Sequence, residues 1–352
     1  MFEPVDVKKD SLITLPLERL GQLLDSIKEP SYRARQIKHW VFHHSIARFE
    51  EMRNIPGNVR ELLAERTIIH PLKLVHITGS EQSRTRKVLF ELQTGEQIET
   101  VLIHERRRTT ICVSSQVGCA LDCKFCATAK MGFLKNLDTA EIVDQVLQVQ
   151  SLVSSRITNV VFMGMGEPFL NYDRVIAAAK ILSDRNGFGL GARRITISTA
   201  GIIPGIRRFV EDGLRFKLAI SLNAGTQNQR EKIMPIATTY AITDLIKAAH
   251  FYHQHSHQLT TFEYVLLRNV NDSFTDSVKL KNLIGRLPCK LNLIPYNEIG
   301  NKFRRPSEER LNTFLKGLKD APFPVTVRRS KGDDIKAGCG QLVVKKVCRA
   351  GT

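Results

Sequence analysis

The sequence predicts an α/β protein whose main domain has a parallel sheet, preceded by a small helical region and a β-hairpin. Three patterns support this fold class: leucines at helical spacing near the N-terminus, strict alternation over residues 71–104, and apolar runs that alternate with helices further on. A chain of 352 residues that is 42% hydrophobic is long enough for one large and one small domain. We expect the divisions 1–70, 71–104 and 105–352.

The first region, residues 1–70, is expected to be helical. Leu17, Leu20 and Leu24 recur at helical spacing, and a second helix is expected to begin after Pro30. The other helix face is basic, which predicts an accessory RNA-binding domain, although a solvated helix face explains the pattern equally well. The basic residues are Arg33, Arg35, Lys38, His39, His43, His44 and Arg48.

Residues 71–104 alternate between apolar and polar side chains around Gly95, which predicts a β-hairpin linking the two domains and carrying Glu99. Beyond it, strand-like runs and helical stretches alternate strictly. This order implies a parallel sheet, doubly wound or barrel-like, with its working groups at the C-terminal strand ends. The expected strands are 110–113, 159–165, 194–199, 216–222, 261–267 and 290–294, and the expected helices include 139–152, 173–182 and 242–253.

The charge balance predicts a polyanionic partner. The chain has 52 Lys+Arg against 35 Asp+Glu, a formal net charge of +17, and nucleic acid is the obvious polyanion. Solubility alone is the alternative explanation. No secretion signal or apolar stretch of membrane-spanning length is present, so we expect a cytoplasmic protein that does not bind membranes.

Three of the seven cysteines stand close together, as Cys119, Cys123 and Cys126. Three thiolates on a short loop are able to hold three irons of a 4Fe-4S cluster, which leaves the fourth iron open to a substrate. A structural zinc site is the alternative, but it requires a fourth ligand, and no second cysteine pair follows. The spacing therefore favours an iron-sulfur cluster.

This loop and the aromatic Phe125 beside its last cysteine resemble the radical S-adenosylmethionine superfamily. The resemblance implies a partial (βα)6 barrel. It also implies that the methionine moiety of S-adenosylmethionine chelates the open iron, and that one electron from the cluster cleaves the sulfonium to give a deoxyadenosyl radical.

Four further segments resemble the RlmN/Cfr family, which methylates adenine carbons in RNA: CVSSQVGC at 112–119, GMGEP at 164–168, NLIPYN at 292–297 and GCGQL at 338–342. One branch methylates C2 of an adenine in the peptidyl transferase centre of 23S ribosomal RNA and of the adenine after the tRNA anticodon. The other methylates C8 of the same ribosomal adenine and confers antibiotic resistance. Residues 164–171 resemble the C2 branch, whereas 32–37 and 46–52 resemble the C8 branch; we expect C2, with C8 as the alternative.

The resemblance also implies roles for individual residues. Cys339 would accept a methyl group from one S-adenosylmethionine, and the radical from a second molecule would activate that methyl for addition to adenine. Cys112 would release the RNA by forming a transient disulfide with Cys339, and Glu99 would accept the ring-carbon proton. The positions matching cofactor contacts are Gly166, Glu167, Ser198, Ser221, Leu222, Asn223 and Asn297, where Asn223 replaces the family's usual histidine.

The expected partners are 23S ribosomal RNA, tRNA and an electron donor such as flavodoxin or ferredoxin. A non-catalytic iron-sulfur RNA-binding module, or a radical enzyme acting on a protein or a small molecule, would leave the Cys112 and Cys339 pair without a role. Several basic side chains are expected to hold RNA phosphates around the target adenine. They are Arg106, Arg107, Arg108, Arg193, Arg194, Arg304, Arg305, Arg328 and Arg329.

Overall fold

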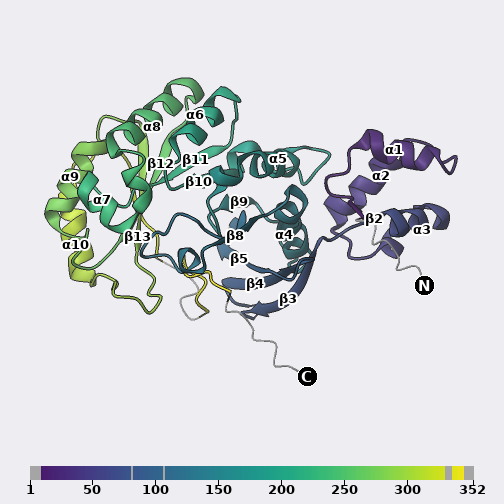
Figure 1. The fold of residues 1–352 in the computed structure, drawn as a ribbon, viewed down its shortest axis with the longest axis horizontal. Helices are drawn as coiled ribbons and strands as arrows, with labels where there is room; N and C mark the ends of the chain where they lie inside the picture. The colour runs from purple at the N-terminus through teal and green to yellow at the C-terminus, as the bar shows by residue number, and fades with distance from the viewer. Residues whose placement is uncertain (1–8, 81, 106–107, 330–334, 345–352) are drawn as a thin grey trace.

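The computed structural model describes residues 9–80, 82–105, 108–329 and 335–344. The N-terminal helices lie to one side of the larger α/β unit (Figure 1). They pack around the predicted apolar positions, such as Leu20, Leu24 and Ile37, which are fully buried. The elements are β1 (Asp10–Ser11), α1 (Leu17–Asp25), α2 (Arg33–His39), α3 (Gly57–Arg66) and β2 (Thr67–Ile68), with β1 and β2 paired in parallel.

The expected hairpin forms, and it extends the main sheet. β4 (Thr85–Leu92) and β5 (Gln97–Glu105) are antiparallel and meet at a turn containing Gly95, which has a φ of +88°. A third strand, β3 (Leu72–Thr78), pairs with β4. β5 pairs in turn with β6 (Arg108–Cys112), so these strands form the antiparallel edge of the barrel sheet.

The parallel part of the sheet confirms the six predicted strands: β6, β9 (Asn159–Phe162), β10 (Ile195–Thr199), β11 (Lys217–Ser221), β12 (Thr260–Leu266) and β13 (Cys289–Pro295). β14 (Val325–Val327) adds a strand that the sequence did not predict, because three residues are too few for a clear pattern. In the described residues the sheet runs in the order β14-β13-β12-β11-β10-β9-β6-β5-β4-β3.

Helices cover the outside of the curved sheet (Figure 1), as expected for a partial (βα)6 barrel. Two of them begin at capping boxes, formed by Asp138 with Glu141 and by Ser273 with Asp276. None of the helices in the described residues has the length and apolar character needed to cross a bilayer. The helices that cover the barrel sheet are α4 (Thr139–Ser151), α5 (Tyr172–Ser183), α6 (Ile203–Glu211), α7 (Gln227–Ile233), α8 (Ile242–Ser256), α9 (Phe274–Ile284) and α10 (Glu308–Gly317).

A buried polar contact joins the helical region to the barrel. The Nδ1 atom of His70 lies 2.5 Å from Oδ1 of Asp144 in α4, and its Nε2 lies 2.9 Å from the carbonyl oxygen of Ile46. Asp144 also accepts a hydrogen bond of 3.0 Å from the backbone N–H of Leu72. Burial lowers the pKa of His70, but the hydrogen bond and the charge of Asp144 outweigh it and raise the pKa overall.

Candidate active site

The three clustered cysteines lie on one loop between β7 (Gln116–Gly118) and a 3-10 turn (Thr128–Met131). The loop is closed by β8 (Phe133–Asn136), which pairs with β7, and by a 2.9 Å hydrogen bond from the N–H of Cys119 to the carbonyl oxygen of Gly132. Gly118 has a φ of +73°, and a Cβ there would lie 1.8 Å from that same oxygen. Only glycine therefore allows the loop to approach β8 so closely.

The three cysteines line a cavity with about 950 Å³ of empty space, part of it open to solvent. Burial raises the pKa of Cys119 to about 12 and that of Cys123 well above its usual value. Thiols in such surroundings become thiolates when a metal binds them. No group of three or more His, Cys, Asp or Glu within the described ranges is placed to hold a single metal ion. Thiolates that bind separate irons of a cluster need not converge on one point.

A buried cation stands behind this loop. Arg230 of α7 is fully buried and donates to the carbonyl oxygens of Ala200 and Leu222, at 2.5 and 3.1 Å, while its Nη1 has no hydrogen-bond partner among the described residues. Burial lowers the pKa of Arg230 to about 10, and Cys123 opposes that shift. A buried guanidinium with one uncommitted nitrogen, beside the cysteines, suits a site that holds a negatively charged cluster. The residues present therefore fit an iron-sulfur group.

Other cavity residues come from the C-terminal ends of the strands, where the sequence predicted them. Gly166, Glu167, Ser198, Ser221 and Asn223 all line the cavity. Glu167 is 3% exposed, and its carboxylate accepts hydrogen bonds from the N–H groups of Phe169 and Ala200, at 3.1 and 2.7 Å. Burial raises the pKa of Glu167 to about 7.

Three other predicted cofactor contacts are deeply buried, and two of them are already hydrogen-bonded: Leu222, Asn223 and Asn297. Leu222 is fully buried and does not line the cavity. Asn223 adopts a left-handed φ of +57°, and its side chain is already bonded to the N–H of Val265 at 2.8 Å. Asn297 also lies outside the lining and donates to the carbonyl oxygen of Cys339 at 3.2 Å, but its buried Oδ1 has no hydrogen-bond partner in the part of the chain that the structure describes.

Cys112 and Cys339 are brought together at the wall of the barrel. Cys112 ends β6, and Cys339 lines both the cysteine cavity and a second, more polar cavity inside the barrel. Burial raises the pKa of Cys112 to about 12, and Cys339 adds to the rise. Both are free thiols here, which does not support a standing disulfide.

Glu99 lies away from both cavities. Its side chain is 8% exposed, and it pairs with Nζ of Lys87 at 2.8 Å and accepts a hydrogen bond of 2.9 Å from the N–H of Val343. The carboxylate is therefore covered by the segment that follows Cys339. The structure does not bring Glu99 to the surface that faces the cluster cysteines.

Comparisons with known proteins agree with this geometry. Residues 113–280 match the model of the Radical SAM superfamily, and residues 11–69 match that of the ribosomal RNA large subunit methyltransferase N-terminal domain. A "probable dual-specificity RNA methyltransferase RlmN" from Dictyoglomus thermophilum is 42% identical, covering 95% of this chain and 96% of that protein. The "dual-specificity RNA methyltransferase RlmN" of Alcanivorax borkumensis is 40% identical, covering 96% and 91%.

The chain belongs to the RlmN family of radical S-adenosylmethionine RNA methyltransferases. A solved radical SAM methyltransferase from Sphaerobacter thermophilus matches with a TM-score of 0.90 and 41% identity, covering 95% of this chain and 99% of that one. The predicted fold class and family are thus confirmed. Membership of the RlmN family implies an iron-sulfur cluster and S-adenosylmethionine as cofactors.

The sequence did not predict that two charged residues, Glu263 and Arg328, act together on Cys339. Glu263 on β12 is 6% exposed, lines both cavities and accepts a 2.6 Å hydrogen bond from Asn292. Burial raises its pKa to about 7, and Arg328 opposes the rise. Arg328 also lowers the pKa of Cys339 against the effect of burial. Their strands lie far apart in the chain, so only the barrel brings them together.

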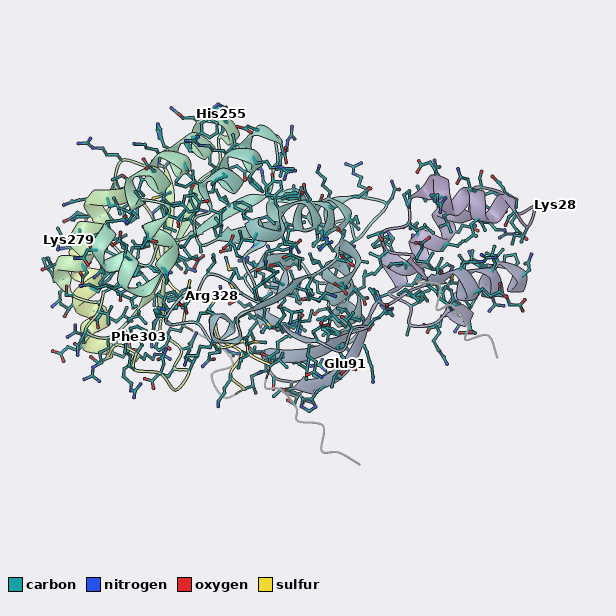
Figure 2. The ribbon with its side chains drawn as sticks, in the orientation of Figure 1. Lys28, Glu91, His255, Lys279, Phe303 and Arg328 are labelled. Atoms are coloured by element: carbon teal, nitrogen blue, oxygen red, sulfur yellow. The ribbon has the colours of Figure 1, made fainter. Side chains whose placement is uncertain are left out.

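The structure places the predicted phosphate contacts in different surroundings. Arg328 lies inside the barrel domain, unlike Lys279 and His255 on its outer helices (Figure 2). Arg329 is paired with Glu308 at 2.7 Å. Arg106 and Arg107 lie outside the described residues.

The N-terminal basic strip is also smaller than expected. Lys38 is 8% exposed and donates to the carbonyl oxygens of Leu12 and Ile13, at 2.6 and 3.2 Å, so it does not face solvent. Burial lowers the pKa of Lys38 to about 8. Arg33 is half-buried and bonded to Glu29 at 2.5 Å. The exposed members of the strip are Arg35, His39, His43, His44 and Arg48.

Proposed function

We propose that this enzyme methylates C2 of a specific adenine in the peptidyl transferase centre of 23S ribosomal RNA and of the adenine after the tRNA anticodon. Curated relatives that match almost the whole chain are named dual-specificity RNA methyltransferases RlmN. The observation that carries the proposal is the position of Cys339, on the wall shared by the cysteine cavity and the polar cavity. We expect it to work in the cytoplasm, where both RNAs occur.

In this proposal the cluster and S-adenosylmethionine supply a methyl group and, after one-electron reduction, a carbon radical. Cys119, Cys123 and Cys126 hold the cluster. Gly166, Glu167, Ser198, Ser221, Leu222, Asn223 and Asn297 form the cofactor-binding region. The cavity-facing side chains supply polar contacts, and burial excludes water from the reacting atoms.

Cys339 acts as the acceptor of the first methyl group, so each turnover requires two molecules of S-adenosylmethionine. Removal of a hydrogen atom from the methyl group on the Cys339 sulfur leaves a carbon radical, which bonds to the adenine carbon and tethers the RNA to the protein. The adduct then loses one electron and the proton of the adenine carbon. The thiolate of Cys112 attacks the Cys339 sulfur, and the carbon–sulfur bond breaks as a disulfide forms. The electron pair of the broken bond stays on the adenine-bound CH2 carbon, which takes up a proton and becomes the methyl group. The methylated RNA leaves, and an external thiol reductant must regenerate both thiols.

Glu99 accepts the proton that the adenine carbon loses. In the described structure its carboxylate is engaged by Lys87 and by the N–H of Val343. Residues 342–344 must therefore move away when RNA binds, so that Glu99 reaches the adduct. This movement follows from the covered position of the carboxylate.

The second cavity supports RNA as the substrate. With about 1630 Å³ of empty space, it is lined by Arg108, Lys217 and Arg328 together with threonines from four strands. Burial lowers the pKa of Lys217, and Arg108, Lys290, Arg194 and Arg193 add to that effect, so these cations gather at one end of the barrel. Gathered cations of this kind attract a phosphate backbone.

The test uses cluster-loaded enzyme with S-adenosylmethionine, dithionite and protein-free 23S ribosomal RNA or tRNA. Mass spectrometry of the digested RNA distinguishes 2-methyladenosine from 8-methyladenosine. We expect the 2-methyl product from both RNAs, its loss in Cys339→Ala, and its retention in the matched control Cys289→Ala, which changes a buried cysteine on β13. The 8-methyl product would assign the chain to the other branch, and cofactor cleavage without RNA methylation would overturn the RNA assignment.

A further inference from the structure

The wall between the cysteine cavity and the polar cavity carries a carboxyl group as well as Cys339. Within the described residues, those that line both cavities are Met163, Glu263, Ile294 and Cys339. Met163 and Ile294 have apolar side chains, so Glu263 and Cys339 are the members of this wall that exchange protons. The proposed methyl acceptor and a buried carboxyl group therefore stand at the same boundary.

The neighbouring strands hold Glu263 at the cofactor end of the barrel. Glu263 on β12 pairs in register with Ser221, the last residue of β11, and with Asn292 of β13. The side-chain amide of Asn292 donates a 2.6 Å hydrogen bond to Oε2 of Glu263. No other hydrogen bond to this carboxyl group forms within the described residues. The amide thus keeps Oε2 as an acceptor and leaves Oε1 to carry a proton.

The surroundings of Glu263 favour a protonated carboxyl group. The side chain is 6% exposed, and burial raises its pKa to about 7 against the opposing effect of Arg328. The other cations of the polar cavity include Arg108 and Lys217, which begin their strands and so lie toward the opposite end of the barrel. An acid whose pKa lies near the working pH is well suited to proton transfer.

We infer that Glu263 is the general acid that gives the transferred carbon its last proton. The inference rests on the proposed function, in which attack by Cys112 breaks the carbon–sulfur bond and leaves the electron pair on the adenine-bound CH2 carbon. The carboxyl group of Glu263 donates its proton to that carbon, which becomes the methyl group. The electron pair of the O–H bond stays on Glu263 as a carboxylate, and water restores the proton before the next turnover.

The other carboxyl groups near the site are less suitably placed. Glu99 lines neither cavity. Glu167 lines the cysteine cavity but not the polar one, and both of its oxygens accept hydrogen bonds from backbone N–H groups. Glu105 lines the polar cavity but pairs in register with Arg108, where β6 begins. Of these carboxyl groups, only that of Glu263 shares both cavities with Cys339.

The experiment is a single turnover of the cluster-loaded enzyme on a tRNA transcript whose adenines carry deuterium at C2. Denaturing gels measure the covalent protein–RNA adduct, and mass spectrometry of its digest shows whether the deuterium remains. Glu263→Gln still accepts a hydrogen bond from Asn292 but has no acidic proton. We expect methylated RNA to be released about 10²-fold more slowly. The adduct that accumulates should have lost its deuterium, because the ring carbon loses its proton before the carbon–sulfur bond breaks.

Three further variants complete the comparison. Glu99→Gln blocks the preceding step, so its adduct should keep the deuterium. Glu263→Asp retains a carboxyl group and should release RNA at least about tenfold faster than Glu263→Gln. The control Glu309→Gln changes an exposed glutamate of α10 and should behave like the unaltered enzyme. Cluster content and cleavage of S-adenosylmethionine should be normal in every variant.

Several outcomes would overturn the inference. Release at the normal rate in Glu263→Gln would exclude Glu263 as the acid, and an adduct that keeps its deuterium would place the block at an earlier step. Slow cleavage of S-adenosylmethionine would assign Glu263 to cofactor binding. Equal impairment of Glu263→Asp and Glu263→Gln would mean that packing was lost rather than a proton. Failure of the proposed function is distinguishable, because Glu99→Gln would then form no adduct at all.

Discussion

The backbone N–H of Val343 donates a 2.9 Å hydrogen bond to Oε2 of Glu99, which joins the segment after Cys339 to the middle of β5. Lys87 holds the other carboxylate oxygen at 2.8 Å. The chain that carries the proposed methyl acceptor thus also covers the proposed proton acceptor. Substrate entry and release of Glu99 are coupled if RNA displaces this segment.

Glu99→Gln tests that coupling. The amide is nearly isosteric but cannot accept the proton, so the RNA adduct should remain bound to Cys339. We expect product formation to fall by about 10²- to 10⁴-fold, while cluster content and reductive cleavage of S-adenosylmethionine stay normal. A denaturing gel with labelled RNA should show a covalent protein–RNA species that Cys339→Ala abolishes. Free methylated RNA at the normal rate would exclude Glu99 as the acceptor.

Arg328 and Glu263 should act on Cys339 in opposite directions. Arg328→Gln removes the cation that favours the Cys339 thiolate, and Glu263→Gln removes the carboxylate that disfavours it. We expect iodoacetamide to alkylate Cys339 roughly tenfold more slowly in the first variant, corresponding to about 1.4 kcal/mol, and faster in the second. Peptide mass spectrometry across pH 6–10 measures both rates.

The control for that experiment is Arg329→Gln, because Arg329 pairs with Glu308 and its side chain is 64% exposed. Its removal should leave the alkylation profile of Cys339 unchanged. Shifts in the same direction for Arg328→Gln and Glu263→Gln would indicate a loss of packing rather than an electrostatic effect.

Gly118→Ala should prevent assembly of the cluster loop. The added Cβ would lie 1.8 Å from the carbonyl oxygen of Gly132, at a positive φ. We expect low iron content after anaerobic reconstitution, measured by metal analysis. Gly95→Ala is the matched control: its φ is +88° but nothing lies within 4 Å, so it should cost only about 1–2 kcal/mol of stability and keep its iron. Full iron content in Gly118→Ala would contradict the close approach of the loop to β8.

His70 should make stability fall at high pH. Its pKa in the folded state is raised above the ordinary 6.5, so the protonated form is favoured by folding. The resulting stabilisation is fully present below pH 6.5 and is lost as pH rises through the folded pKa. Urea titrations at pH 5.5–8.5 should show this loss, and His70→Gln should remove it. An unchanged pH dependence in His70→Gln would mean that other groups cause it.

The local pattern of the chain determined much of this protein. Residue alternation and helical spacing are properties of neighbouring residues, so six of the parallel strands and the first helices were predicted correctly, whereas the short parallel strand β14 was not. The spacing of Cys119, Cys123 and Cys126 likewise predicted one loop, because ligands this close in sequence are close in space.

Only the tertiary structure decided contacts between distant segments. The lysine at position 38 looked solvent-exposed in a basic strip, yet packing turns it toward Leu12 and Ile13. Arg328 was predicted only as a phosphate contact, and its position directly after β14 also brings it within electrostatic reach of Cys339 and Glu263. The exposure of Leu134 and the covering of Glu99 by Val343 depend on how strands pack after folding. Sequence periodicity shows which face of an element is buried, but not which distant element buries it.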